Sequence, residues 1–404
     1  MRVTDKVIIA AFMLLTACDA GEAGKVDKMA ASVKERYAPD KRTVLFNVSA
    51  EKQGGRLVLK GETTSPLAKD KLFHLLDSAG IEVTDSLQVL PGNDVGKNVF
   101  GVARLSVCNL RVEPGHSAEM ATQVLLGTPL KIIKDEGSWL LVQTPENYIA
   151  WTQESGLTRM DSAGFAVWQS QPKLIYTADF GQALLDPSSG QVVSDLVIGD
   201  ILVAGGETGS FYNAVFPDGR TAFIKKEEAQ LLDNWIGSLN PSGESVLEIA
   251  RQMMGAPYLW GGTSAKGMDC SGFTKTAYFM NGIILPRDAS QQVFSGLSVD
   301  IYAGDTVSIA SCLLHLRKGD LIFFTNDPAR QNEENARITH VGIYIENGEF
   351  IHSSGFVHRS SLLDTAENYS ERHAKTLTKA RRILGSGEEN GISLINMHPL
   401  YKGK

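Results

Sequence analysis

Alternating apolar and polar residues dominate the middle of the chain and predict short β-strands. Between residues 103 and 233 these runs are separated by Gly and Pro turns, a pattern typical of small β-barrels. The pattern also repeats without gaps, because Gly127–Trp151 aligns with Gly199–Phe223 at a constant offset. The repeat predicts two related barrels, one over residues 103–160 and one over residues 161–233.

The region before the barrels has a different pattern. Two β-rich runs at residues 44–48 and 56–61 precede a helical segment at Ser65–Ala79 and a further strand near residues 81–90. Residues 19–102 are therefore expected to form a tether followed by a small α/β domain. No residue of this domain is assigned to chemistry.

The region after the barrels mixes helical and strand periodicities. A linker rich in Gly, Asn, Pro and Ser at Asn234–Gly243 marks a domain boundary. Beyond it, Ser271–Met280 suits an amphipathic helix, and two β-rich runs flank Asn347 and Gly348 as in a hairpin. The predicted fold class is thus multidomain α+β, with a small N-terminal α/β unit, two β-barrels and a C-terminal α+β domain over residues 240–404.

Residues 1–18 are predicted to be a targeting segment. Arg2 and Lys6 precede the apolar run Val7–Leu15, which is too short to span a bilayer stably. The segment ends in Leu-Thr-Ala-Cys at Cys18 and resembles a bacterial lipobox, which implies that Cys18 becomes diacylated. An ordinary cleaved signal with an incidental cysteine is the alternative. We expect an exported protein that is lipid-anchored at the bacterial cell envelope, without a spanning helix.

Composition narrows the possible functions. The chain has 404 residues, more than one core usually contains, and its net charge of −7 gives no reason to expect a nucleic-acid partner. Cys108 and Cys312 lie in different predicted domains, and we expect both to be free, buried thiols, although an exported protein offers the alternative of a disulfide. No Cys/His group has zinc-ligand spacing, so neither a metal nor another cofactor is expected.

The candidate nucleophile is Cys270, which follows a glycine-rich loop and opens the helix predicted from Ser271. Asp269 is placed to cap that helix. Unpaired backbone N–H groups and the helix dipole favour a thiolate there, so we expect the pKa of Cys270 to be lowered. A buried cysteine is more often only a small apolar residue, and catalysis also requires a base.

Two histidines on the predicted hairpin are candidates for that base and its partner. A two-residue loop would place His340 and His352 on opposite faces of the hairpin. A three-residue loop at residues 346–348, with its glycine left-handed, pairs Gly342 with His352 and places both histidines on one face. That arrangement suits a relay in which His340 is the base and His352 orients it. The other histidines, including His373, remain unassigned.

Five motifs in this order resemble those of the NlpC-type cell-wall cysteine peptidases, over roughly residues 240–404. They are Asp269–Phe273, Leu285–Asp288, Lys318–Phe324, His340–Tyr344 and His352. The resemblance implies a papain-like fold, a Cys/His/polar triad and hydrolysis of peptide bonds that involve D-amino acids. Residues 297–316 depart from the pattern as an apparent insertion, which could reshape one wall of the cleft.

The barrels resemble bacterial SH3-like modules. Such modules often bind cell-wall material, but in some members of the family the first one builds a wall of the active site. Tyr148 has Arg220 as its counterpart in the second copy, so it is a candidate for a copy-specific task, although turn positions also vary freely. By resemblance to two-barrel enzymes of this family, Tyr148 and Glu119 would meet the free amino end of a substrate.

The same resemblance implies further substrate-binding residues in the C-terminal domain. They are Tyr258, Trp260, Asp269 and Ser271, with Arg287 and Ser290 from a second motif. Asp269 could pair with a substrate ammonium group. Packing in the core is the alternative for the two aromatic residues, and support of the loop is the alternative for Arg287 and Ser290.

The expected function is hydrolysis of the γ-D-Glu–L-diamino acid bond in peptidoglycan stem peptides, with Cys270 as nucleophile. If the first barrel crowds the site, only stems with a free N-terminal L-Ala fit, and L-Ala-γ-D-Glu is released as in murein peptide recycling. The alternatives are an endopeptidase of intact wall with glycan-binding barrels, a non-catalytic wall-binding protein, and acyl transfer to an acceptor other than water. The oligomeric state is not predicted.

Overall fold

The computed structural model describes residues 5–402, which divide into two compact units. The first runs to Gly96 and also includes Ile132–Asp135, and the second contains the rest of the described chain. Of the predicted targeting segment, residues 1–4 lie outside the described residues, and residues 5–18 belong to helix α1 (Asp5–Tyr37). Within the described part of the chain, no helix combines the length and apolarity needed to cross a bilayer.

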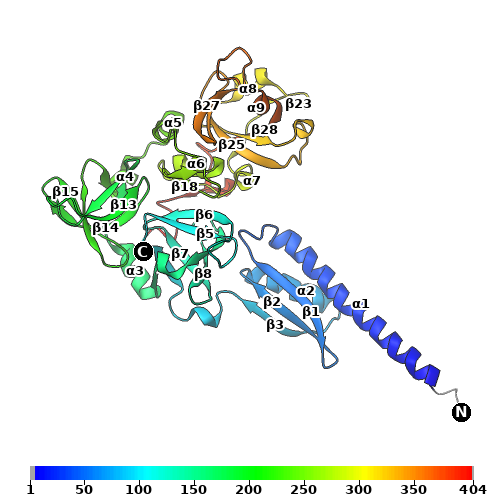
Figure 1. Ribbon diagram of the computed structural model, residues 1–404. Coiled ribbons are helices and arrows are strands. Elements are labelled where there is room, and N and C mark those ends of the chain that lie inside the picture. Colours follow the sequence, from blue (N-terminus) through cyan, green and yellow to red (C-terminus); the bar gives the residue numbers. More distant parts are fainter. Residues whose placement is uncertain (1–4, 403–404) are drawn as a thin grey trace. The chain divides into compact units, whose positions relative to one another are not determined.

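The first unit is a three-stranded sheet with two helices packed against it (Figure 1). Its elements after α1 are β1 (Phe46–Gln53), β2 (Arg56–Thr63), α2 (Pro66–Ser78), β3 (Thr84–Val89) and the 3₁₀ turn η1 (Asn93–Val95). Strands β1 and β2 form an antiparallel hairpin, and α2 carries the chain across to β3, which runs parallel to β2. Ser65 caps α2 by accepting from the Ala68 N–H. These elements match the predicted α/β unit.

The second unit begins with two β-modules, each a seven-stranded sheet. The first β-module, residues 100–160, contains β4 (Phe100–Ala103), β5 (Val107–Arg111), β6 (Met120–Leu125), β7 (Pro129–Asp135), β8 (Trp139–Gln143), β9 (Ile149–Gln153), η2 (Glu154–Gly156) and β10 (Leu157–Met160). The second β-module, residues 173–231, contains β11 (Lys173–Tyr176), β12 (Phe180–Leu184), β13 (Val192–Val197), β14 (Ile201–Thr208), β15 (Phe211–Val215), β16 (Thr221–Lys225) and β17 (Ala229–Leu231). Helix α3 (Ser162–Ser170) connects them.

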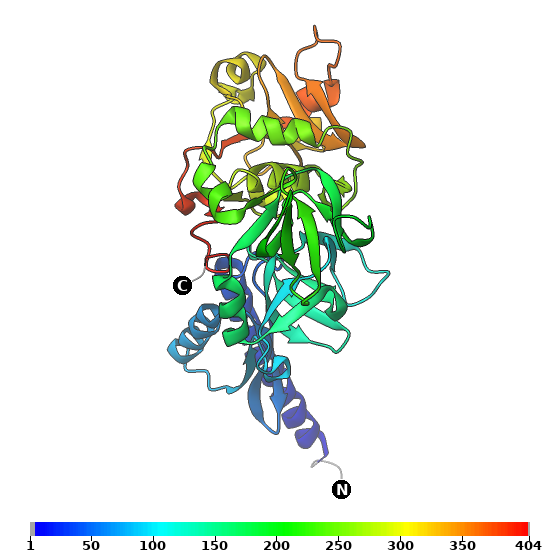
Figure 2. The ribbon, with the colours of Figure 1, turned by 90° about the vertical axis from the view of Figure 1, so that its left-hand side faces the viewer.

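The two β-modules have the same strand order, as the sequence repeat predicts. The first sheet runs β10-β4-β7-β8-β9-β5-β6, and the second, written from its other edge, runs β17-β11-β14-β15-β16-β12-β13. Each strand of one therefore has its equivalent at the same place in the other. The strands of the second β-module are the green arrows in Figure 2.

The C-terminal region is an α+β domain that follows helix α4 (Leu232–Ser238). Its helices are α5 (Gly243–Gln252), α6 (Cys270–Phe279), α7 (Ala289–Gln292), α8 (Ile309–His315) and α9 (Glu371–Thr376), with 3₁₀ turns η3 (Pro328–Arg330) and η4 (Glu388–Asn390). Its six-stranded sheet has the order β21 (Leu297–Ser298), β28 (Leu377–Arg382), β24 (Leu321–Thr325), β25 (Ile338–Tyr344), β26 (Glu349–Ser354) and β27 (Phe356–Ser361). Short two-stranded ladders are β18 (Thr263–Ser264) with β19 (Gly267–Met268), β20 (Ile283–Ile284) with β29 (Ser393–Leu394), and β22 (Tyr302–Ala303) with β23 (Thr306–Val307).

Helix α6 lies against the sheet beside β25 and β26, and this packing places the site (Figure 1). Phe273 and Ala277 are fully buried in the shared core. The predicted insertion at residues 297–316 forms β21, the β22–β23 hairpin and α8, and it joins a second core through Cys312. Cys108 and Cys312 are both free and buried, which confirms the prediction for these two thiols.

Candidate active site

The candidate nucleophile lies at the first residue of α6, as predicted. Asp269 is the N-cap, and its Oδ1 accepts from the Gly272 N–H at 2.7 Å. The backbone N–H of Val341 donates to the Cys270 sulfur, which places the thiol beside the strand that carries His340. The Cys270 side chain is buried, with 7% of the residue exposed.

The expected lowering of the Cys270 pKa is wrong for the free protein. Burial raises the pKa of this thiol to about 12, and the neighbouring Asp269 carboxylate acts in the same direction. The N–H groups of Val341 and Ser271 and the charge of Arg287 oppose this shift, but they do not outweigh it. Desolvation penalises a thiolate more than the helix N-terminus stabilises it, so Cys270 is a neutral thiol at rest.

This protonation state predicts how Cys270 reacts with iodoacetamide. Only the thiolate reacts, so the alkylation rate should rise about tenfold per pH unit from pH 7 to pH 10, without a plateau. Mass spectrometry of the peptide that contains Cys270 measures this rate separately from the other cysteines. A plateau reached below pH 8 would instead indicate a preformed thiolate.

The two histidines come from the hairpin β25–β26, and its register is the predicted one. Ile343 pairs with Ile351, and the same register sets His352 opposite Gly342. Asn347 and Gly348 both have positive φ, at 51° and 80°, which closes the three-residue loop. Both rings therefore share one face of the sheet.

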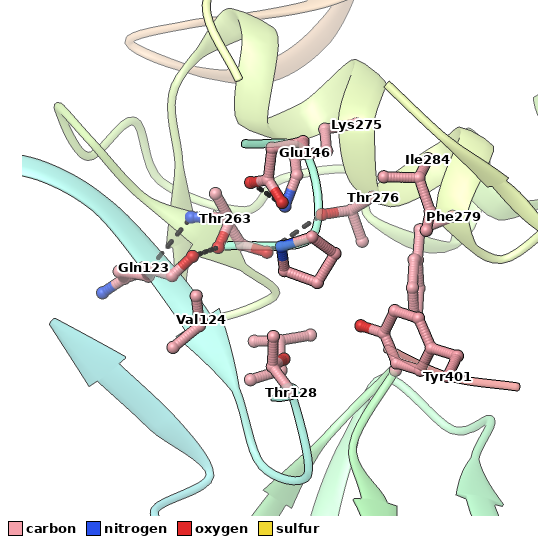
Figure 3. A pocket seen from close by; sticks show the side chains of 13 residues that line it. Gln123, Val124, Thr128, Glu146, Thr263, Lys275, Thr276, Phe279, Ile284 and Tyr401 are labelled. Atoms are coloured by element: carbon pink, nitrogen blue, oxygen red, sulfur yellow. Dashed lines mark hydrogen bonds and ion pairs between the residues drawn. The ribbon is translucent and has the colours of Figure 1, made fainter. Parts of the chain in front are cut away.

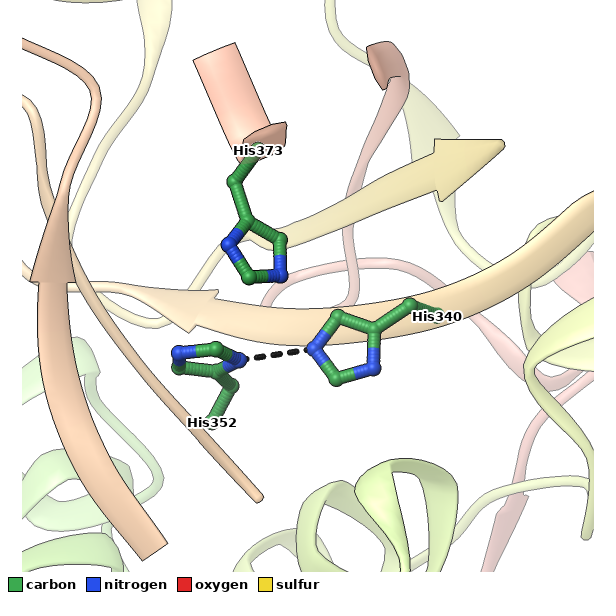
Figure 4. A group of neighbouring side chains, drawn as sticks. All are labelled: His340, His352 and His373. Atoms are coloured by element: carbon green, nitrogen blue, oxygen red, sulfur yellow. Dashed lines mark hydrogen bonds between the residues drawn. The ribbon is translucent and has the colours of Figure 1, made fainter. Parts of the chain in front are cut away.

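The imidazoles of His340 and His352 contact each other directly. His340 Nε2 and His352 Nδ1 are 2.7 Å apart, and the far nitrogen of His352 lies 3.1 Å from Ser360 Oγ (Figure 4). Burial lowers the pKa of His340 to about 3 and lowers the pKa of His352 as well. Both rings are thus uncharged at neutral pH, so His340 has a lone pair with which to accept the thiol proton.

A buried ion pair supports the loop next to the nucleophile. The guanidinium of Arg287, with 1% of the residue exposed, donates to both oxygens of Asp269, at 2.7 and 3.1 Å. It also donates to Ser271 Oγ at 2.9 Å and to Thr122 Oγ1, on β6 of the first β-module, at 2.6 Å. Asp269 therefore already has a cationic partner, and Arg287 joins the first β-module to the start of α6.

The first β-module also contacts the loop of Tyr258 and Trp260. Glu119 Oε1 accepts from the indole N–H of Trp260 at 2.8 Å, and the backbone of Thr263 donates to Gln123 Oε1 at 3.0 Å. Trp260 is 62% exposed, whereas Tyr258 is half-buried, and its pKa is raised by burial and then by the nearby Cys270 and Asp269. Neither aromatic residue is part of the core.

A second contact from the first β-module reaches the loop after β20. The buried Tyr148 donates its hydroxyl hydrogen to Asp288 Oδ2 at 3.1 Å. Its counterpart Arg220 instead pairs with Asp218 within the second β-module. The tyrosine thus makes a contact that its repeat partner does not. Ser290 lies half-buried on α7, two residues beyond Asp288.

Comparisons with known proteins agree with this geometry. A model of the NlpC/P60 family matches residues 255–382. The gamma-D-glutamyl-L-lysine dipeptidyl-peptidase of Bacillus cereus is 30% identical over 243 residues, which cover 58% of this chain and 67% of that relative. The chain belongs to the NlpC/P60 family. Cys270, His340 and His352 are therefore the candidate triad of a cysteine-type peptidase.

Two further similarities extend the match beyond the NlpC/P60 domain. A model described as the bacterial dipeptidyl-peptidase Sh3 domain matches residues 110–157, within the first β-module. Dipeptidyl-peptidase 6 of Lysinibacillus sphaericus is 26% identical over 310 residues, which cover 73% of this chain and 92% of that relative. The crystal structure of an NlpC/P60 family protein from Bacillus cereus has a TM-score of 0.59 at 24% identity, with 70% of this chain and 99% of that chain covered. The multidomain fold is thus shared.

In this NlpC/P60 peptidase, residues of the first β-module and of α6 line a partly open cavity of ≈ 40 Å³ (Figure 3). Glu146 and Lys275 form an ion pair at 2.9 Å beside it, and Gln123 accepts from the backbone N–H of Thr263, another lining residue. Such a volume has room for ordered water and none for a substrate. The cavity therefore belongs to the joint between module and peptidase domain.

Several polar residues of the NlpC/P60 site carry no signal in the sequence. They are Thr122, which binds Arg287, Ser360, which binds His352, and Gln292, which is fully buried and donates to the carbonyl of Ser271 at 3.0 Å. His373 on α9 also lies beside the two hairpin histidines (Figure 4). Each of them comes from a strand, loop or helix whose position depends on the tertiary fold.

Proposed function

We propose that this peptidase hydrolyses the γ-D-Glu–L-diamino acid bond of peptidoglycan stem peptides that have a free N-terminal L-Ala. The product is the dipeptide L-Ala-γ-D-Glu, as in the recycling of murein peptides. The observation that carries the proposal is the contact of the first β-module with the peptidase loop, through Glu119 and Trp260 at 2.8 Å. The names of the Bacillus cereus and Lysinibacillus sphaericus relatives support the same activity.

The proposed chemistry is acyl transfer to water. The sulfur of Cys270 attacks the γ-carbonyl carbon of D-Glu while its proton passes to His340. His340 then returns the proton to the departing amine, which leaves a thioester on Cys270. Water, deprotonated by His340, hydrolyses the thioester and restores the thiol. A neutral thiol next to a neutral imidazole, the state that burial favours, is the starting state that this sequence requires.

Two kinds of group assist this chemistry. Backbone N–H groups at the start of α6 are the natural donors to the oxyanion, because the first N–H groups of a helix have no partner within it. His352 contacts the Nε2 atom of His340. The other ring nitrogen of His340 is therefore the one that we assign to the thiol proton. Ser360 holds His352 in turn and is a positioning residue.

The proposed specificity comes from the wall that the first β-module builds. Its acidic group, Glu119, belongs to the first β-module and contacts Trp260 of the peptidase loop, and it is exposed to an incoming ammonium group. Tyr148 fixes Asp288 on the adjacent loop. A stem peptide with a blocked or glycan-linked N-terminus has no ammonium group for Glu119 to attract. Its additional group would also need the space that the first β-module fills.

Changing this wall should weaken cleavage of the free tripeptide. We expect Glu119→Gln to raise KM for L-Ala-γ-D-Glu-L-Lys by about tenfold, because a charged hydrogen bond is worth about 1.5–3 kcal/mol. Tyr148→Phe should act in the same direction with a smaller effect. Steady-state kinetics measure both. Glu113→Gln, at an exposed acid in the same loop, is the matched control and should leave KM unchanged. Unchanged kinetics in both wall variants would refute the proposed role.

We also propose that Cys18 is acylated and anchors the enzyme at the cell envelope. The support is the sequence Leu-Thr-Ala-Cys after a short apolar run. Cells fed a radiolabelled fatty acid should label the natural protein and leave Cys18→Ala unlabelled. Equal labelling of both proteins would place the lipid elsewhere, and labelling of neither would remove the anchor.

A further inference from the structure

A third histidine adjoins the catalytic pair. His373, on the short helix α9, faces the rings of His340 and His352 in Figure 4. One nitrogen from each of the three rings lies within 4.8 Å of the other two. The ring centroids are 4.7 Å apart for His352 and His373, and 5.2 Å apart for His340 and His373. The NlpC/P60 mechanism described above does not use His373.

Two of the three rings have their second nitrogen held by a serine hydroxyl. Ser370 Oγ lies 2.7 Å from Nδ1 of His373, which leaves Nε2 of that ring for the cluster. Ser360 holds the far nitrogen of His352 in the same way. Phe324 and Phe350 pack against His373, with ring centroids 4.9 and 5.4 Å from its own. Metal-binding histidines commonly have their second nitrogen held by such a partner, because it orients the ring.

We propose that His340, His352 and His373 together bind one Zn²⁺ ion, and that the bound zinc inhibits the peptidase. Zinc accepts three imidazole nitrogens at about 2.0–2.1 Å and completes a tetrahedron with water. Nitrogens in that geometry lie about 3.3 Å apart. The hairpin nitrogens, now 2.7 Å apart, therefore have to separate by a few tenths of an ångström. The longest separation in the cluster, up to 4.8 Å, has to close by about 1.5 Å, through rotation of the histidine side chains.

Inhibition follows from the nitrogen that zinc would occupy. The ion would replace the proton between His340 Nε2 and His352 Nδ1, so the relay would lose the hydrogen bond that aligns the base. A neutral imidazole that binds zinc through Nε2 carries its ring proton on Nδ1, so His340 would have no lone pair with which to accept the Cys270 proton. This inhibition rests on the proposed function, whereas zinc binding itself does not.

The first experiment measures binding without relying on catalysis. Isothermal titration of untagged Cys270→Ala protein with zinc chloride should show one ion per chain, because the proposed ligands are all intact and the thiol is absent. Adding His373→Gln to this protein should weaken binding by at least about tenfold. The matched control is His358→Gln. His358 lies 4.5 Å from His352 between ring centroids but outside the cluster, so its removal should leave the affinity unchanged.

Two outcomes overturn the proposal. If Cys270→Ala protein binds no zinc, any effect of zinc on the natural enzyme comes from the thiol and not from the three histidines. If zinc binds equally well with and without His373, this residue is not a ligand. His373→Phe provides a second deletion of the ligand, because a phenyl ring suits the neighbours Phe324 and Phe350. If the glutamine variant does not fold, the zinc affinity of His373→Phe shows whether His373 is a ligand.

The second experiment measures inhibition of the active enzyme. Zinc should reduce hydrolysis of the free tripeptide, and a chelator should restore it. Measured against its own zinc-free rate, the His373→Gln variant should require at least about tenfold more zinc for half-inhibition than the natural protein. The same half-inhibiting concentration in both proteins would contradict the proposal. If the tripeptide is not a substrate, the titration alone decides whether zinc binds.

Discussion

Cys270→Ala should lower the rate of tripeptide hydrolysis by at least about 10⁴-fold, the largest functional effect expected from one substitution. The variant removes the sulfur that forms the thioester and leaves the helix and its Asp269 cap in place. Adding His340→Ala should cost little more, because residues that act in one relay are strongly non-additive. Single-turnover assays of the single and double variants measure both losses of rate.

The chain provides matched controls for this experiment. Cys108 and Cys312 are also free and buried. Cys108 lies on β5 of the first β-module, and Cys312 lies on α8 in the core that also contains Phe350 of the hairpin. Cys108→Ala and Cys312→Ala should retain kcat within about threefold, provided that each protein is folded. If Cys270→Ala keeps more than a tenth of the natural activity, Cys270 is not the nucleophile and the relay has no role in catalysis.

Arg287→Met should cause the largest loss of stability, about 3–5 kcal/mol in the free energy of unfolding. The guanidinium is buried and donates to Asp269, Ser271 and Thr122, so its removal leaves a buried carboxylate without its cation. Methionine retains the apolar stem, which limits the effect of lost packing. Urea denaturation, followed through tryptophan fluorescence, measures the change.

A double variant separates the contribution of the ion pair to stability from the contributions of the other contacts of Asp269 and Arg287. The double variant Asp269→Asn/Arg287→Met should be less destabilised than the sum of the two single variants. Each single variant leaves one buried charge without its partner, whereas the double variant leaves none. Additive effects would indicate that the two residues are not coupled. A loss below about 1 kcal/mol for Arg287→Met would mean that the pair contributes little to holding the first β-module on the peptidase domain.

The sequence is most informative where one local rule determines the geometry. The hairpin of His340 and His352 is an example, because side chains alternate along a strand and the three-residue loop then fixes which faces they share. Helix α6 is another, since Asp269 caps it as its position predicts. The repeat similarly predicts two sheets with equivalent strand order.

Predictions fail, or are impossible, where the answer depends on the tertiary environment. The pKa of Cys270 is one case, because the degree of burial, which pattern alone does not reveal, outweighs the helix terminus. Ser360 is a common polar residue that reaches His352 from the neighbouring strand β27, and Thr122 is another, whose partner Arg287 comes from a loop far along the chain. His373 lies on a separate short helix, so no spacing rule relates it to the hairpin. The link from Asp269 to Arg287 likewise appears only when two loops are brought together.

The most direct test of the proposed function compares two peptides that differ at one end. L-Ala-γ-D-Glu-L-Lys, with a free amino group, and its N-acetylated form are incubated with the enzyme, and Cys270→Ala protein serves as the blank. We predict release of L-Ala-γ-D-Glu from the free peptide and at least about 100-fold slower cleavage of the acetylated one, because its N-terminus lacks the charge that Glu119 attracts. Equal cleavage of both peptides would contradict this account and favour an endopeptidase that acts on intact wall.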